Sequence, residues 1–381
     1  MTSYTHICLL SEQPIPNLCP LFDSHITAGE VLFVVTPQQQ WQMPRMEEVL
    51  RPRGIKAAAI QVDDAMNYQN ILDILETEIK GRKALGQQLL INATGGTKPM
   101  SIAAHFAGYN QDIPVFYVQN DRVYWLETGV ELLDDFDIEE RLPLEPFIQA
   151  HGFTLVSRKP VQVRPEHMNL FRSIITMPSY SAEIKNLNFL AHLAEQSNKL
   201  DVALPSHFVN SESLQALFDK LQEEKLITVK KDSLSFTTRE NRALCNGLWL
   251  EDFCYKEAES MKSQIPTLRE VARSVEIKGQ GRGREPVDNE LDLVLLNNNR
   301  LYLIECKTRS FKNSEPVVDD ALYKLEALRR KVGGLYAKAM LVSFYPVGEK
   351  YKKRAATLDI TLVDGPRLLD NFRSELARWL D

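Results

Sequence analysis

The sequence predicts an α/β protein built from more than one domain. From Tyr4 to about Val118, short apolar runs alternate with amphipathic helical stretches, the pattern of a mostly parallel sheet. Two helices and a two-strand element follow over 181–238, and a second α/β pattern begins near Asn241. Because 381 residues exceed what one hydrophobic core usually supports, we expect these regions to fold separately.

The first domain is predicted to be Rossmann-like and to span residues 1–145. Five apolar runs predict its strands: THICLL, VLFVV, AAAIQV, QLLINA and PVFYV. In the stretch over 68–80, isoleucines and leucines recur at helical spacing while acidic residues point outward. This helix should therefore cover one face of the sheet.

A linker domain is predicted over 146–240. Prolines among acidic residues over 134–165 indicate a connector, because this composition breaks helices. The helices over 182–196 and 211–224, followed by the strand pair LITVKKDSLSFT, resemble a winged helix-turn-helix. We expect this linker to transmit signals between the domains on either side.

The third domain is predicted over 241–381, with a second α/β fold. The helix LCNGLWLEDFCYKEAE leads to the hairpin NELDLVLLNNNRLYLIECKT. A helix over 319–331 and a strand over 339–343 then continue the pattern. Two basic features of this domain, the stretch over 278–284 and the helix residues Lys324, Arg329 and Arg330, are either phosphate contacts or ordinary solvated charges.

Composition limits the class of protein. The start MTSYTHICLLSEQ has no basic leader, and no apolar run approaches the roughly 18 residues of a membrane helix, so we expect no export and no membrane contact. Five cysteines without a C-x-x-C pair predict reduced thiols and a cytoplasmic location. The formal net charge of −6 argues against a nonspecific nucleic-acid coat, so any nucleic-acid site must be local.

Charged residues stand out in the apolar hairpin of the third domain. Asp292 lies on the first strand, and Glu305 and Lys307 share one face of the second. If an even-length turn within the asparagines at 297–299 and a neighbour joins the strands, Asp292 lies on that same face. An odd loop would require a bulge. As an isolated triplet, E-x-K is equally compatible with a surface strand pair.

Buried carboxylates in such a cluster repel one another unless a cation neutralises them. Carboxylate and carbonyl oxygens suit Mn²⁺ or Mg²⁺, and we expect Asp292, Glu305 and the backbone carbonyl of Cys306 as ligands, with Glu251 completing the set directly or through water. Lys307 would orient the attacking water in phosphodiester hydrolysis. The predicted catalytic residues are thus Glu251, Asp292, Glu305 and Lys307.

The segments GLWLE, NELD and LIECKT resemble the restriction-endonuclease-like superfamily, also called PD-(D/E)XK nucleases. The proline of the family name is absent, because Leu291 precedes Asp292. The resemblance implies a metal-dependent endonuclease.

In the first domain, the strand QLLIN leads into a glycine-containing loop and a helix that begins at Pro99. The loop matches neither the Walker A motif nor G-x-G-x-x-G, so ATP hydrolysis is not predicted. Its glycines, helix N-terminus and donor side chains suit a phosphate or ribose, although a plain capped turn would look the same. The loop after the first strand opens at the same sheet edge. The expected binding residues are Ser11, Glu12, Gln13, Asn92, Thr94, Gly95, Gly96, Thr97, Lys98 and Ser101.

Together with the nuclease segments, NATGGTKPMS resembles the CRISPR-associated Rossmann-fold (CARF) sensor domain, and the domain order is similar to the Card and Can nuclease group. The resemblance implies a homodimer activated by a cyclic oligoadenylate, most simply cyclic tetra-adenylate, bound between the sensor domains. It also implies cutting of DNA, RNA or both in antiviral defence. The alternatives are a ligand-responsive transcription regulator with an inert nuclease fold, and an unregulated repair or restriction nuclease.

Overall fold

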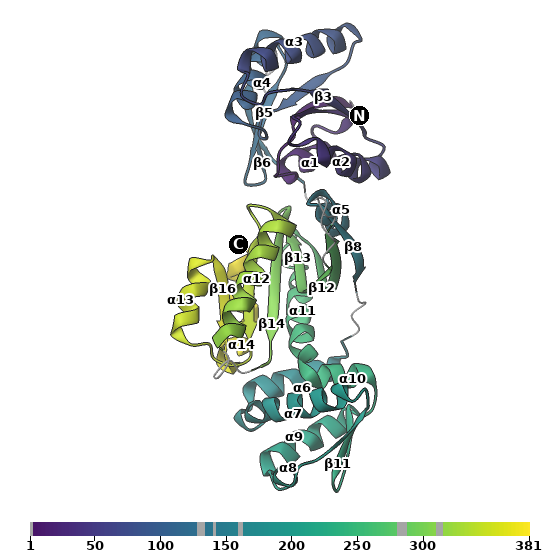
Figure 1. Ribbon diagram of the computed structural model, residues 1–381, viewed down its shortest axis with the longest axis vertical. Coiled ribbons are helices and arrows are strands. Elements are labelled where there is room, and N and C mark those ends of the chain that lie inside the picture. The colour runs from purple at the N-terminus through teal and green to yellow at the C-terminus, as the bar shows by residue number, and fades with distance from the viewer. Residues whose placement is uncertain (1–2, 128–133, 140–141, 159–162, 280–287, 310–314) are drawn as a thin grey trace.

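The computed structural model describes residues 3–127, 134–139, 142–158, 163–279, 288–309 and 315–381. Residues 280–284 of the basic stretch predicted over 278–284 lie outside the described residues. Figure 1 shows an elongated molecule, with the N-terminal domain at one end, the C-terminal domain in the middle and the linker unit at the other end.

The N-terminal domain contains the parallel sheet that the sequence predicts. Its seven strands have the order β3-β2-β1-β4-β5-β6-β7, and β1 to β5 are parallel neighbours. The last two strands are antiparallel additions at the edge. The bounds are β1 (Tyr4–Leu9), β2 (Ala28–Val35), β3 (Lys56–Gln61), β4 (Leu89–Asn92), β5 (Val115–Gln119), β6 (Arg122–Glu127) and β7 (Phe136–Asp137).

Helices cover both faces of this sheet. On one face, α3 (Tyr68–Ala84) and α4 (Lys98–Asn110) pack onto a core that includes Ile71, Leu75 and Ala103. The core on the other face receives α1 (Ile15–Phe22) and α2 (Met43–Leu50), the latter flanked by 3-10 turns at Gln40–Gln42 and Arg51–Arg53. The helical spacing noted over 68–80 is confirmed, since Ile71, Leu75 and Ile79 are all buried.

A six-stranded sheet of order β16-β15-β14-β13-β12-β8 forms the C-terminal domain. Strands β8, β12, β13 and β14 are antiparallel neighbours, whereas β15 and β16 run parallel to β14. The bounds are β8 (Phe153–Arg158), β12 (Leu268–Gly279), β13 (Asp288–Asn297), β14 (Arg300–Lys307), β15 (Lys338–Ser343) and β16 (Ile360–Asp364). Its helices are α11 (Trp249–Met261), α12 (Glu315–Gly333), α13 (Glu349–Thr357), α14 (Pro366–Asp370) and α15 (Phe372–Leu380).

Strand β8 corrects the predicted linker over 146–240. After α5 (Leu144–Ala150), the chain hydrogen-bonds along β12 from Phe153 to Arg158, so this segment is an edge strand of the C-terminal sheet. Its alternating burial identifies a strand but not the sheet that it joins. The strand β8 joins this sheet because β12 would otherwise have an unpaired edge.

From α7 to β11, the linker unit has the element order of a winged helix: a helix, a strand, two helices and two strands. Its three strands have the order β10-β11-β9. The bounds are α6 (Pro165–Thr176), α7 (Pro178–Gln196), β9 (Asp201–Ala203), α8 (Ser206–Val209), α9 (Glu212–Glu223), β10 (Ile227–Lys230), β11 (Ser233–Phe236) and α10 (Arg239–Ala243).

The linker unit does not lie between the other two domains (Figure 1), so its position does not support the expectation that 182–238 relays signals between them. The N-terminal domain instead contacts the C-terminal domain directly. The Gln13 Oε1 atom accepts a hydrogen bond from the Leu335 backbone N–H at 2.9 Å. One apolar cluster also continues across both domains, from Phe33 to Leu303. A shared hydrophobic core favours movement of the N-terminal and C-terminal domains together, as one packed unit.

None of the helices in the described parts of the chain has the length and apolar content needed to cross a lipid bilayer. All five cysteines lie in the described parts of the chain, where they are buried and form no disulfide.

Candidate catalytic centre and ligand-binding loop

The turn between β13 and β14 fixes the geometry of the charged cluster. Asn297 pairs with Arg300, so only Asn298 and Asn299 form the turn, with φ values of 48° and 51°. Positive φ at both positions is the geometry of a type I′ hairpin turn, which asparagine tolerates. The two-residue loop meets the even-length condition set by the sequence. Since Leu293 pairs with Ile304, the register brings Asp292 opposite Glu305.

Asp292 is anchored to the neighbouring strand through its side chain. Its Oδ2 atom accepts a hydrogen bond from the Cys306 backbone N–H at 2.8 Å. In an extended strand the N–H and C=O of one residue point to the same side, so the Cys306 carbonyl is directed toward β13 as well. The Cys306 thiol is buried, and burial raises its pKa well above the ordinary value, which suits a core side chain rather than a nucleophile.

Lys307 is a partly buried cation within this cluster. Its Nζ atom forms an ion pair with Glu305. Burial alone would lower the pKa of Lys307, but the carboxylates of Glu305 and Asp292 outweigh that effect and raise it. Lys307 therefore stays protonated at neutral pH.

Two carboxylates of the cluster are held in an unfavourable environment. Burial raises the pKa of Asp292 to about 7, and the nearby Glu305 carboxylate adds to the rise. Burial also raises the pKa of Glu251 to about 8, with Asp292 as the next cause. Lys307 opposes both shifts but does not cancel them. The cluster thus contains more buried negative charge than its own cations neutralise.

A backbone irregularity places Glu251 at the start of α11. The π-helical turn Leu244–Leu248 precedes this helix, and Gly247 within it has φ 117°. A Cβ atom at Gly247 would lie 2.3 Å from Thr308 Oγ1, so only glycine allows this approach to the end of β14. The Ser274 hydroxyl, on β12, lies 3.5 Å from Glu251 Oε2.

The sequence reasoning missed two charged neighbours of the cluster, Arg273 and Glu290. Arg273 is buried on β12 and pairs with Asp252, and its charge lowers the pKa of Glu251. Glu290 has the opposite effect on both Glu251 and Asp292. Arg273 in the strand-forming segment over 268–277 was the available signal, but the segment gives no indication of which residues on neighbouring elements it meets.

In the N-terminal loop, side chains predicted to bind a ligand instead hold the loop in shape. Asn92 is fully buried, and its Nδ2 donates to the Pro16 carbonyl at 2.8 Å while its Oδ1 accepts from the Thr94 backbone N–H at 3.0 Å. The Thr94 hydroxyl in turn accepts from the Val118 backbone N–H at 2.8 Å. Asn92 therefore cannot touch a ligand, which corrects its predicted role.

The rest of the loop closes over the end of β1. A Cβ atom at Gly95 would lie 2.0 Å from the Leu9 carbonyl oxygen, and Gly96 has φ 72°. The Ser101 hydroxyl donates to the Gly95 carbonyl at 3.3 Å. The Thr97 hydroxyl caps α4 by accepting from Met100 N–H and donates to the Ala65 carbonyl. These contacts fix the loop before any ligand arrives.

The groups that remain accessible are fewer than predicted. Gly96 and Lys98 are exposed, and Thr94 and Thr97 are half-buried. The end of β1 at Leu9 lies beside Gly95, and in the loop over 11–13 that follows β1, Glu12 is exposed but Gln13 is engaged in the contact with Leu335. The structure thus assigns Gln13 to the domain interface and leaves Lys98 as the one exposed lysine of this loop.

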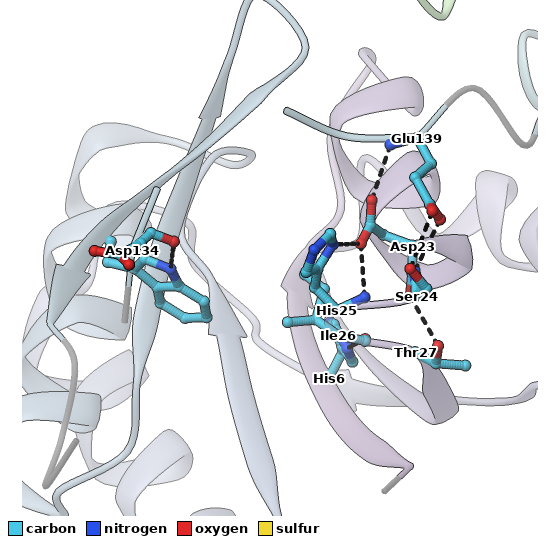
Figure 2. A network of polar contacts seen from close by, with 9 residues as sticks. His6, Asp23, Ser24, His25, Ile26, Thr27, Asp134 and Glu139 are labelled. Carbon is cyan, nitrogen blue, oxygen red and sulfur yellow. Dashed lines mark hydrogen bonds and ion pairs between the residues drawn. The ribbon is translucent and has the colours of Figure 1, made fainter. Parts of the chain in front are cut away.

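A separate cavity of about 730 Å³ lies at the opposite edge of the N-terminal sheet, between Tyr4, His25, Trp125 and Phe136. Figure 2 shows the polar contacts of this edge, in which Asp23 accepts hydrogen bonds from His25 and from the Glu139 backbone N–H. These contacts tie the segment over 134–139 to the loop before β2. No residue of either predicted site lines this cavity, and no pattern in the sequence predicts it.

Family comparisons match both α/β domains. The model described as the Card1 CARF domain matches residues 5–146, and the model described as the Card1-like endonuclease domain matches residues 238–381. The chain thus combines a Card1-type CARF domain with a Card1-like endonuclease domain.

Solved structures similar to this Card1-like endonuclease extend over the whole chain. Protein VC1899 from Vibrio cholerae is 26% identical, with a TM-score of 0.91 and coverage of 99% of this chain and 98% of that one. Can2 from Sulfobacillus thermosulfidooxidans, solved in complex with cyclic tetra-adenylate, is 25% identical, with a TM-score of 0.80 and coverage of 99% of both chains.

A type III CRISPR defence DNA nuclease activated by cyclic oligoadenylate shares the fold at 18% identity, with a TM-score of 0.59 and coverage of 91% of this chain and 46% of that one. Curated protein sequences gave no significant match.

An endonuclease domain of this type implies a divalent metal. Among the described residues, no three histidine, cysteine, aspartate or glutamate side chains lie close enough together to hold an ion. The predicted set, Asp292 and Glu305 with the Cys306 carbonyl, contains only two acidic side chains, and Glu305 is turned toward Lys307. These residues fit a divalent cation because oxygen donors gather where negative charge is uncompensated, as the raised pKa of Asp292 indicates.

Proposed function

We propose that this Card1-like endonuclease is a cytoplasmic homodimer that hydrolyses phosphodiester bonds of DNA or RNA with Mn²⁺ or Mg²⁺ and is activated by cyclic tetra-adenylate. The observation that carries the proposal is the half-buried cluster of Asp292, Glu305 and Lys307 at the end of a hairpin. It occurs in a chain that is similar over its whole length to Can2, whose structure contains cyclic tetra-adenylate.

In the proposed reaction, Asp292, Glu305 and the Cys306 carbonyl hold the cation, with Glu251 bound directly or through water. When bound, such an ion activates water and neutralises charge on the scissile phosphate. The protonated Lys307 ammonium orients the attacking water and stabilises negative charge in the transition state. Binding of the ion would also favour the ionised forms of Asp292 and Glu251, whose pKa values are raised in its absence.

The activator is proposed to bind at the loop over 94–98. The N-terminus of α4 presents backbone N–H groups there, and the exposed Lys98 adds positive charge, a combination that favours phosphate. Because Gly96 and Lys98 are exposed, this loop would cover only one side of a bound cyclic tetra-adenylate ring. A second surface would have to form the wall on its other side.

A second copy of the chain is proposed to supply that wall. Ile102, Phe106 and Tyr109 recur along one face of α4 and are 50%, 45% and 60% exposed. Tyr117 on β5 and the residues Tyr124 and Leu126 on β6 are also exposed, on the side of the sheet that α4 covers. An apolar patch of this kind beside a ligand loop is typical of a subunit interface. A twofold axis through it would let one ring contact both copies of Lys98.

The contact between domains offers a direct route from the loop to the catalytic hairpin. Thr94 holds Val118 on β5, and β5 ends in a turn at Asn120 and Asp121 whose φ values are 49° and 68°. Asp121 Oδ1 accepts a hydrogen bond from Asn299 Nδ2 at 2.7 Å. The tips of two hairpins thus meet, and the second hairpin carries Asp292 and Glu305 at its far end. We propose this turn-to-turn contact, rather than the linker unit, as the route of activation.

The surface of the linker unit does not favour the transcription-regulator alternative. In a winged helix, the helix at the position of α9 usually enters the DNA groove. The exposed face of α9 carries Glu212, Asp219 and Glu223, and Lys220 is engaged by Glu223 and Glu224. An acidic face repels the phosphate backbone.

Incubation of the purified protein with Mn²⁺ and labelled single-stranded DNA, duplex DNA or RNA, with and without cyclic tetra-adenylate, tests the proposal. We expect cleavage that requires both metal and activator and is absent from a Glu305→Ala variant. Equal cleavage without activator would identify an unregulated nuclease. No cleavage of any nucleic acid under all conditions would overturn the catalytic assignment.

A further inference from the structure

A small cavity adjoins the catalytic cluster on the side of the linker unit. It has a volume of about 210 Å³ and is lined by Lys185, Asn188, Phe189, His192, Asn246, Thr308 and Arg309. The first four of these residues belong to α7, whereas Thr308 and Arg309 directly follow Lys307 at the end of β14. A substrate strand that extends from Lys307 toward the linker unit would therefore meet this cavity.

Hydrogen bonds fix α7 against the catalytic strand. Asn188 Nδ2 donates to both the Thr308 carbonyl at 3.0 Å and the Thr308 hydroxyl at 3.1 Å. On the other side, Gly247 packs against the same Thr308 hydroxyl, in the turn that leads to Glu251. The helix α6 contacts α11, and α7 contacts the π-helical turn that precedes α11, so the linker helices lie at this end of the C-terminal domain (Figure 1). The cavity and the catalytic cluster are thus parts of one rigid arrangement.

The lining of the cavity is basic and aromatic, in contrast to the acidic face of α9. Lys185 and Arg309 are exposed, and none of the seven lining residues is acidic. Phe189 is 48% exposed at the rim, where its inner edge contacts Phe208. His192 Nδ1 is buried with no hydrogen-bond partner among the described residues. Asn246 Nδ2, in the same lining, donates a hydrogen bond to Glu195 at 2.8 Å.

We propose that this cleft between α7 and the end of β14 binds an unpaired nucleic-acid strand beside the scissile phosphate. The assignment rests on the proposed nuclease function and names its substrate-holding surface. Lys185 and Arg309 contact phosphates that flank the cut, and Phe189 stacks on one base. A flat aromatic ring at the rim accepts any base but requires that the base be unpaired. The winged-helix unit therefore serves as a wall of the substrate cleft.

Fluorescence anisotropy tests this assignment with a labelled oligo-dT strand, an oligo-U strand and a blunt DNA duplex. All variants are made in a Glu305→Gln background, with Mn²⁺ and cyclic tetra-adenylate present, so that binding is measured without cutting. We expect Phe189→Ala to weaken strand binding by roughly tenfold, because one base-stacking contact is lost. Phe189→Trp keeps a ring and should retain the affinity.

The double variant Lys185→Ala, Arg309→Ala should weaken strand binding and reduce its salt dependence. Each phosphate contact on a single strand contributes about 0.7 to the slope of log K against log salt, so the slope should fall by about 1.4. Lys230→Ala, an exposed lysine on β10 of the same unit, is the matched control and should bind as the parent does. The two strand probes report whether DNA or RNA is held.

If the parent protein binds and cuts but the cleft variants behave like Lys230→Ala, the cleft assignment is wrong and the nuclease assignment stands. If Phe189→Ala weakens duplex binding as strongly as strand binding, the unpaired-base assignment is wrong. If the active parent neither binds nor cuts any probe, the proposed function itself fails.

Discussion

The ligand loop of the N-terminal domain and the catalytic cluster of the C-terminal domain handle their polar groups in opposite ways. In the loop, Asn92 and Thr94 satisfy each other and the neighbouring backbone. In the cluster, Asp292 and Glu251 are half-buried beside further carboxylates, and loss of solvent raises their pKa values to about 7 and about 8. Because the polar groups of the loop already have hydrogen-bond partners, the loop keeps one conformation before a ligand binds. A cluster with uncompensated charge is complete only with a cation.

Removal of a cluster carboxylate should have the largest effect. Asp292→Ala or Glu305→Ala should abolish cleavage, because each change removes an oxygen ligand that nothing nearby replaces. Activator binding, measured by calorimetry, should be unchanged, since the loop over 94–98 lies in another domain. Lys307→Ala should lose most turnover yet still bind Mn²⁺, because an ammonium group is not a metal ligand. Cleavage by a purified Asp292→Ala, Glu305→Ala double variant would contradict the assignment.

The loop should respond more moderately, since its shape does not depend on its one exposed lysine. Lys98→Ala should weaken binding of cyclic tetra-adenylate by roughly tenfold, as expected for a charge-assisted hydrogen bond worth about 1.5–3 kcal/mol. Metal affinity should not change. Lys80→Ala, an exposed lysine on α3, is the control. An unchanged dissociation constant for Lys98→Ala would move the activator site elsewhere.

The turn-to-turn contact joins the two regions, and breaking it should uncouple them. Asn299→Gly and Asp121→Gly keep the positive φ of each turn but remove the hydrogen-bonding side chain. We expect activation by cyclic tetra-adenylate to fall several-fold, because a bond of this kind contributes about 1 kcal/mol. Binding of the activator should persist. A double-mutant cycle on activated cleavage separates this bond from other contacts of Asp121. Additive effects of the two changes would indicate that the signal takes another route.

A smaller effect should appear in the stability of the metal-free protein. Because the folded pKa of Asp292 is raised from 3.8 to about 7, the folded state binds this proton more tightly than the unfolded state. The wild-type protein should therefore lose stability as pH rises from about 4 to about 7. Asp292→Asn removes that charge and should stabilise the chelator-treated protein at pH 8 by on the order of 1–3 kcal/mol, with little gain near pH 4. Thermal unfolding at both pH values measures the difference. A variant less stable than the wild-type protein at pH 8 would show that the ionised Asp292 carboxylate does not destabilise the folded state.

Local patterns in the sequence were sufficient wherever the structure depends on neighbours along the chain. Alternation along β13 and β14 predicts that Asp292 and Glu305 share one face if the asparagine turn has an even length, and the two-residue turn meets that condition. Apolar runs separated by amphipathic helices likewise predict the parallel sheet of the N-terminal domain. In each case the side chains involved are fixed by strand periodicity or turn length, which are local properties.

The tertiary structure alone decided which distant segments meet. No local signal tells that β8 pairs with β12, that Arg273 approaches Glu251, or that Gln13 faces Leu335 rather than a ligand. Asn92 looks like a ligand donor in the sequence, but burial and its bond to Pro16 make it part of the scaffold. The sequence likewise does not indicate that the linker unit lies at the far end of the molecule (Figure 1). Such contacts depend on how complete surfaces pack, and the residues that make them carry no pattern along the chain that specifies their partners.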